Sequence, residues 1–274
     1  MKRPIYLLSM LGFAALAVAG GDPVTLRLSL DKPFTQKYLV ETKMVQQIDL
    51  SAAGQGEQEM VMNSSMLYKY DVAKAAEDGK AEMKTTVSDI KVEMEGGQGA
   101  PGMDMPKEIV MKGKVDDLGK MYEMKVEGQV NPQIEAMMGS ATNGTNTLVF
   151  PDKPVNIGDT WKIKLPATKY TKESELTATF VETKNENGVV HKIKVTGPVV
   201  SDTKMGGEET GGQQMTVKGT TTLEMFYEVD GANGWTKALN GKMNSDSTID
   251  IESVGITLKM KGAGTVKMTV PKKS

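Results

Sequence analysis

The sequence predicts a mainly β protein whose long, curved antiparallel strands form a half-barrel or a barrel-like sheet. Apolar and polar residues alternate along many segments after residue 20, and clusters of Gly, Asn and Asp separate these segments. The long apolar run rich in Leu and Ala lies within the first 19 residues. Because side chains alternate between the two faces of a strand, this pattern predicts one apolar face turned toward a shared interior.

The chain before residue 148 contains six segments with the pattern of strands. They are residues 24–30, 37–50, 60–70, 80–94, 109–115 and 120–126. In the first, every second residue from Val24 to Leu30 is apolar. In the second, the apolar phase changes after Thr42, which predicts a β-bulge near Met44. The last two are expected to form a hairpin closed by the turn at residues 116–119.

Residues 132–139 are predicted to form one short helix. Asn131 suits the N-cap and Pro132 suits the first helical position. Ile134 and Met137 then follow the spacing of one helical face. The run of Gly, Ser, Thr and Asn that comes next is expected to end the helix.

The stretch at residues 148–161 divides the chain into an N-terminal β half, residues 20–147, and a C-terminal β half, residues 148–274. We expect the two halves to form one continuous unit. Two prolines in the stretch exclude a helix and a central strand. The Gly-Asp pair that follows indicates a turn, in which Asp159 is expected to bond to its own backbone. Trp161 is expected to anchor the second half to the first.

The second half repeats the alternating pattern of the first. The expected strands are residues 161–165, 173–182, 189–195, 215–230, 247–251, 256–260 and 265–270, with a further strand that begins at Trp235. Residues 67–71 resemble residues 225–229, so a loose internal duplication is one explanation of this repetition. The ordinary alternation of strands is the other.

The first 19 residues have the features of a cleaved signal peptide. Lys2 and Arg3 form a short basic region, an apolar run follows, and Ala17 and Ala19 provide a cleavage site after Ala19. A retained anchor is the alternative, but the apolar run is short for a membrane-spanning helix. The chain has no Cys, so a lipoprotein anchor and disulfides are excluded. We therefore expect a secreted or periplasmic protein, without a transmembrane segment in the mature chain.

Composition excludes several classes of function. Without Lys2 and Arg3 the chain has 31 basic and 35 acidic residues, a net charge of about −4. Arg27 is the single Arg of that mature chain and aromatic residues are scarce, so nucleic acid is not an expected partner. His191, the one His, is expected to be a half-exposed strand residue. Nucleotide, zinc-protease and serine-hydrolase motifs are absent from the sequence, and no cofactor is expected.

Two motifs carry a family resemblance. Residues 150–161, Phe-Pro-Asp-Lys-Pro-Val-Asn-Ile-Gly-Asp-Thr-Trp, resemble the PdkPVxxGDxW hallmark of an uncharacterised family of secreted bacterial β proteins. Residues 226–235 resemble a later hairpin of the same family. The resemblance implies an exported β protein and names no catalytic residue. At the level of fold alone, long curved strands with a small helix are similar to lipoprotein-carrier half-barrels, which hold acyl chains.

Methionine is unusually frequent, with 21 residues in the chain. Met60 and Met62 have the spacing that places both on one face of a strand, where flexible thioethers line an adaptable interior. The inward residues expected to line a ligand cavity are Met60, Met62, Met83, Met111, Trp161, Phe180, Met225 and Trp235. Thioether pairs also bind Cu(I), and Met103 and Met105 form such a pair in a Gly- and Pro-rich loop.

These observations support three hypotheses for a protein that we expect not to be an enzyme. The first is binding of a lipid or other apolar molecule in a Met-lined concavity. The second is a structural or interaction role in the cell envelope, with a protein partner and a solid core. The third is Cu(I) binding through Met pairs. A filled interior would favour the second over the first.

Overall fold

The computed structural model describes residues 22–95, 106–128, 148–185, 188–206 and 214–271, and these form one antiparallel sheet that is curved but not closed. This confirms the predicted fold class. The strands are β1 (Phe34–Asp49), β2 (Glu57–Val72), β3 (Ala81–Glu95), β4 (Glu108–Val115), β5 (Met121–Glu127), β6 (Thr160–Leu165), β7 (Ser174–Asn185), β8 (Val189–Met205), β9 (Met215–Asp230), β10 (Thr236–Ile251) and β11 (Ile256–Thr269). A single 3-10 turn, η1 (Ser51–Ala53), lies between β1 and β2. The helix predicted at residues 132–139 lies outside the described residues.

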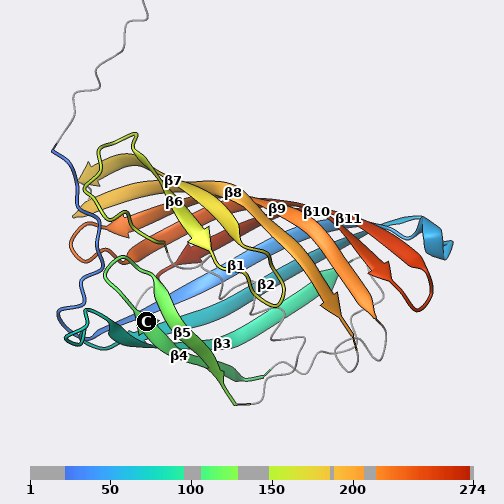
Figure 1. Ribbon diagram of the computed structural model, residues 1–274, viewed down its shortest axis with the longest axis horizontal. Coiled ribbons are helices and arrows are strands. Elements are labelled where there is room, and N and C mark those ends of the chain that lie inside the picture. The colour runs from blue at the N-terminus through green and yellow to red at the C-terminus, as the bar shows by residue number, and fades with distance from the viewer. Residues whose placement is uncertain (1–21, 96–105, 129–147, 186–187, 207–213, 272–274) are drawn as a thin grey trace, which may run out of the picture.

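The sheet joins two meanders (Figure 1). Its strand order is β5-β4-β3-β2-β1-β11-β10-β9-β8-β7-β6, so each strand pairs with its sequence neighbours within a meander. The exception is the central pair of β1 and β11, which runs from Leu39 opposite Thr269 to Asp49 opposite Lys259. This pair connects the first meander to the second, and β5 and β6 are left as the two edges of the sheet.

Three strands depart most from the segments that the sequence predicts. β8 continues through Gly197 and Pro198, and β10 and β11 are each continuous where two short segments were expected. Thr196 is the last residue of β8 that pairs with β7. Pro198 lies beyond it, so the absence of an N–H on Pro198 removes no hydrogen bond between β8 and β7. The bulge predicted near Met44 is wrong, because the register of β1 is unbroken against both of its neighbours.

Residues 24–30 are not the strand that their alternation predicts. The segment is extended and buries Leu26, but its backbone bonds go to separate loops instead of one neighbouring strand. Val24 exchanges bonds of 2.8 and 2.9 Å with Val155, and the Leu28 N–H donates to the carbonyl of Asp117 at 2.7 Å. The segment therefore fills one end of the curved sheet as part of the core.

Arg27 holds this N-terminal segment to both halves of the chain. Its guanidinium donates to the carbonyls of Pro151 and Asp152 at 2.6 and 2.7 Å and pairs with Asp117 at 3.3 Å. The Trp161 indole N–H donates instead to Val149, which belongs to the same half as Trp161, at 2.8 Å. Arg27 therefore adds a hydrogen-bonded link between the halves to the pairing of β1 with β11, while the indole bond of Trp161 stays within the second half.

The two ends of the long strands differ in burial. At the end where β1 begins, inward side chains such as Tyr38, Phe180 and Ile193 are almost fully buried, with exposed fractions of 3%, 1% and 0%. At the end where β1 meets η1, the inward apolar side chains are only partly buried. We call the first the packed end and the second the open end; they lie at the left and right of Figure 1.

Candidate ligand-binding face

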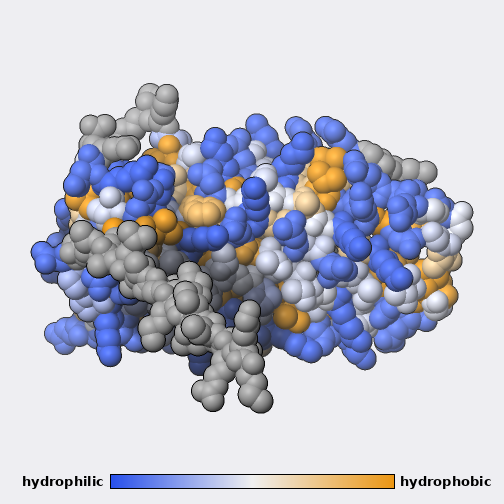
Figure 2. Space-filling view, turned by 90° about the horizontal axis from the view of Figure 1, so that it is seen from above, coloured by the Kyte–Doolittle hydropathy of each residue, from blue (hydrophilic) through white to orange (hydrophobic). Residues whose placement is uncertain are grey.

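The inward face of the sheet carries no charged side chain at any described strand position. On β1 the inward residues are the even-numbered ones from Phe34 to Ile48, because Tyr38 and Val40 of that set are buried. The register extends this assignment to every other strand. The Lys, Asp and Glu residues of the strands lie on the opposite face or at bulges, and Figure 2 shows a mostly hydrophilic surface with small, separate apolar patches.

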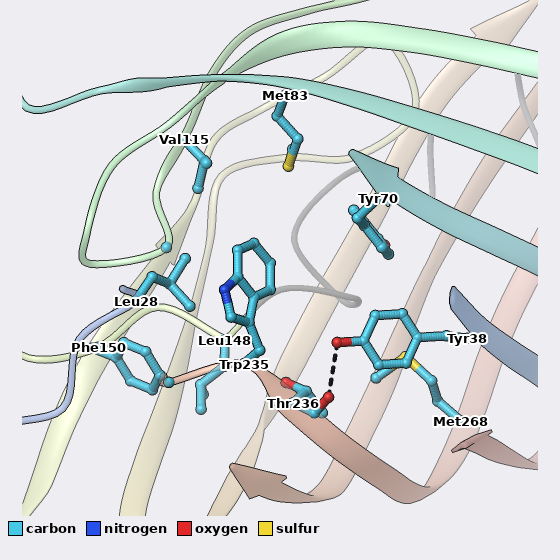
Figure 3. Close-up of a pocket in the computed structure, with 12 residues that line it drawn as sticks. Leu28, Tyr38, Tyr70, Met83, Val115, Leu148, Phe150, Trp235, Thr236 and Met268 are labelled. Atoms are coloured by element: carbon cyan, nitrogen blue, oxygen red, sulfur yellow. Dashed lines mark hydrogen bonds between the residues drawn. The ribbon is translucent and has the colours of Figure 1, made fainter. Parts of the chain in front are cut away.

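The packed end encloses a small cavity beside Trp235 (Figure 3). Trp235 stacks on Phe34 with ring centroids 4.7 Å apart, and the Tyr38 hydroxyl donates to the carbonyl of Thr236 at 2.8 Å. The cavity measures about 20 Å³, counted over the positions that the centre of a water molecule can occupy. That is room for about one water molecule and far too little for an acyl chain. The interior at this end is therefore filled.

Two close approaches of backbone explain how the packed end closes. Gly234 has a φ of 74°, and a Cβ there would lie 1.9 Å from the carbonyl oxygen of Arg27. Gly119 has a φ of 80°, and a Cβ there would lie 2.4 Å from the carbonyl oxygen of Leu148. Only glycine combines this backbone conformation with this proximity, so the turns after β4 and β9 can seat the two extended segments.

Buried tyrosines form part of the core at the packed end. Tyr70 contacts Tyr38 edge-to-face with ring centroids 5.6 Å apart and stacks on Tyr68 at 6.3 Å. Burial raises the pKa of Tyr38, Tyr70 and Tyr227 above the ordinary value for a phenol. These side chains are therefore neutral at physiological pH and add no charge to the core.

The open end presents apolar side chains interspersed with polar ones, among them Gln46, Gln58, Ser245 and Ser247. Its inward apolar residues are all partly exposed and belong to no part of the buried core, and we call this set the open face: Met44, Ile48, Met60, Met62, Val92, Met94, Met215, Val217, Ile249, Ile251, Ile256, Leu258 and Met260. Met66, Ile90 and Met243 lie between the open face and the core and pack against the core. Six of the open-face residues are methionines, so this face is adaptable in shape.

The eight residues predicted to line a cavity are divided between the two ends. Met83, Met111, Phe180, Met225 and Trp235 are buried at the packed end, and only Met83 and Trp235 line the small cavity there. Trp161 is partly buried at the edge strand β6, where it packs against the core. Met60 and Met62 lie on the open face. The Cu(I) pair Met103 and Met105 lies outside the described residues.

Sequence reasoning missed Met44, Met94 and Met260 on the open face. Met44 has the same parity as Tyr38 and Val40, so an unbroken alternation along β1 was the available signal. The expected bulge obscured it. Met94 is placed inward by the bulge at Asp89, whose φ is 50°, which the sequence does not reveal.

His191 is buried and not half-exposed as expected. It is 6% exposed and its Nδ1 lies 3.0 Å from the Thr183 hydroxyl, while Phe180 packs edge-to-face on its ring. Burial lowers the pKa of His191, so the neutral ring is favoured. No group of three or more His, Asp or Glu that could hold a metal occurs in the described part of the chain. Asp159 accepts from the backbone N–H of Asn156 at 2.8 Å, the turn bond predicted for it.

The chain is similar to a protein family of unknown function. The family, described as DUF6263, matches residues 110–236, a region that runs from β4 to the start of β10 and includes residues 150–161. No curated protein matches the chain. None of the helices in the described residues is long and apolar enough to cross a membrane.

Proposed function

We propose that this is an exported, non-enzymatic protein that binds the acyl chain of a lipid, or a similar apolar molecule, on the open face. The observation that carries the proposal is a partly exposed apolar surface on which no inward strand position is charged. A protein surface that contacts only water usually carries charged residues, which keep the protein soluble. The outward face of the sheet carries many of them. The resemblance of residues 150–161 to secreted β proteins supports the same proposal, as does the likeness, at the level of fold alone, to half-barrels that hold acyl chains.

The dimensions of the open face suit one acyl chain. Between Thr42 and Ile48, β1 advances roughly 20 Å at about 3.3 Å per residue. The hydrocarbon of one membrane leaflet is about 15 Å deep, half the thickness of the bilayer core. Burial of a methylene group contributes about 0.8 kcal/mol, and association costs about 4 kcal/mol or more. Long chains are therefore expected to bind far more tightly than chains of about six carbons, which gain little beyond that cost.

A charge placed on the open face tests this proposal. Met62→Glu should weaken the binding of a fluorescent long-chain fatty acid at least about tenfold, because a carboxylate would be buried against the chain. Asn63→Glu is the matched control, since Asn63 is the next residue of β2 and faces outward. Native mass spectrometry of the gently purified protein should also show a co-purifying lipid.

Two outcomes would contradict the proposal. One is the absence of both a co-purifying lipid and any fatty-acid binding by the unaltered protein. The other is an equal loss of binding in Met62→Glu and Asn63→Glu, which would place the ligand elsewhere.

A structural or interaction role in the envelope is the second candidate. It is favoured by the packed end, whose interior is filled to within about one water molecule. Under this role the edge strands β5 and β6 would present unpaired backbone groups to a protein partner. The fatty-acid titration separates the two candidates, because only the first requires a ligand on the open face.

A further inference from the structure

Four methionines lie in one row across five neighbouring strands. Met94 of β3 is opposite Met62 of β2, and Met62 is opposite Met44 of β1. Met44 is opposite Gly264 of β11, and Gly264 is opposite Met243 of β10. All four methionines face inward and are partly exposed. The row therefore gathers thioethers that lie far apart in the sequence.

The geometry of the row allows its sulfur atoms to converge. Directly opposite residues of antiparallel strands have Cβ atoms about 4.5–5.5 Å apart. Met62 thus has a thioether neighbour on each side, and the three rotatable bonds of Met let the sulfurs approach one point. Gly264 leaves space beside Met44, and a Cβ at Gly264 would lie 3.4 Å from the Met243 methyl group. The Met243 methyl group therefore lies close to Gly264, the residue opposite Met44.

The surroundings of the row select one class of metal ion. The described inward strand positions carry neither a carboxylate nor a thiolate, so hard cations such as Ca²⁺ and Mg²⁺ find no anionic ligand there. His191, the one imidazole, is buried at the packed end. Neutral thioethers are soft ligands that favour Cu(I). A monovalent soft ion also brings only one positive charge onto an uncharged face.

We propose that Met44, Met62 and Met94 form a thioether site for a soft monovalent metal ion, Cu(I) or Ag(I), with Met243 available as a fourth ligand. The site stands apart from the pair Met103 and Met105, and it requires neither a lipid nor any oxidation or reduction at the protein. It occupies the side of the open face formed by β1, β2 and β3, so metal and acyl chain would share part of one surface.

Replacement of sulfur by carbon tests the site without removing the apolar surface. The full-length protein should compete for Cu(I) against a colorimetric Cu(I) chelator, and Ag(I) should shift the ¹³C-methyl NMR signals of three or four methionines. The triple variant Met44→Leu, Met62→Leu, Met94→Leu should lose at least tenfold in Cu(I) affinity. The matched control is Met66→Leu, Met215→Leu, Met260→Leu, which removes three inward thioethers from other rows and should bind as the unaltered protein does.

The outcomes separate this proposal from the binding of lipid. Leu and Met are similar in volume and apolarity, so a loss of Cu(I) affinity in the triple Leu variant reports on the sulfur atoms and not on the apolar surface. Failure of the unaltered protein to compete for Cu(I) would overturn the metal site and leave the lipid proposal intact. Equal Cu(I) affinity in the triple variant and the control would also overturn it, since the metal would then be held by other methionines.

Discussion

The packed end and the open end share the long strands β1, β2, β3, β9, β10 and β11 and the same uncharged inward face, yet only one is a conventional core. At the packed end, residues 24–30 and 148–155 lie across the inward face and bury it. At the open end no other segment among the described residues buries the inward face, and it stays partly exposed. The comparison teaches that alternation specifies which face is apolar, and that separate segments decide whether this face becomes core or surface.

The largest expected difference between the ends is the loss in the free energy of unfolding when an inward side chain is truncated. Phe180→Ala should lower the free energy of unfolding by about 3–5 kcal/mol, because Phe180 is 1% exposed within the core. Met62→Ala should cost about 1 kcal/mol or less, because the Met62 side chain already contacts solvent. Urea denaturation of the two variants measures both values. Equal costs would show that the open face is packed as tightly as the core.

A second comparison uses one glycine turn from each end. Gly234→Ala should lower the free energy of unfolding by about 3 kcal/mol, because Ala disfavours the positive φ at this position and its Cβ would clash with the Arg27 carbonyl. Gly255, in the turn between β10 and β11 at the open end, has a φ of 65° and no atom within 4 Å of an added Cβ. Gly255→Ala should therefore cost only about 1 kcal/mol. Similar thermal midpoints for the two variants would contradict a tight closure at the packed end.

The smallest expected effect is a difference in reactivity. In dilute hydrogen peroxide, Met44 and Met62 should be oxidised roughly tenfold faster than Met83 and Met225, because sulfoxide formation follows exposure. Peptide mass spectrometry over time measures the individual rates. Rates that do not separate by end would mean that the open face is shielded from small solutes.

Local patterns sufficed to predict most of the fold. The alternation and the turn residues predicted the strand class and most strand positions, including β9 at residues 215–230. They failed at residues 24–30, because a strand and an extended segment that bonds to several loops have the same alternation. Only the tertiary partners, Val155 and Asp117 among them, distinguish the two.

The sequence predicted the kind of candidate site, an inward apolar face with methionines, but not which part of the sheet forms it. Met60 and Met62 were placed correctly on an inward face by their spacing alone. Met83, Met111 and Met225 have the same local pattern and are buried, because coverage by distant segments is not encoded in the alternation of a single strand. The row of Met44, Met62 and Met94 depends on the register between three strands, which no segment reveals by itself.

The pairing of β1 with β11 has a consequence for how the molecule assembles. β11 is the last strand in the sequence, so the first meander can pair with the second only after β11 has been synthesised. Because β1 and β11 are far apart in the sequence, we expect their pairing to be a slow step in folding. If the two termini were joined and the connection between β5 and β6 were opened, the strands would follow one another in space in the same order as along the chain. Such a circular permutant would contain only neighbour-to-neighbour strand pairs, and it would be expected to fold faster into the same sheet.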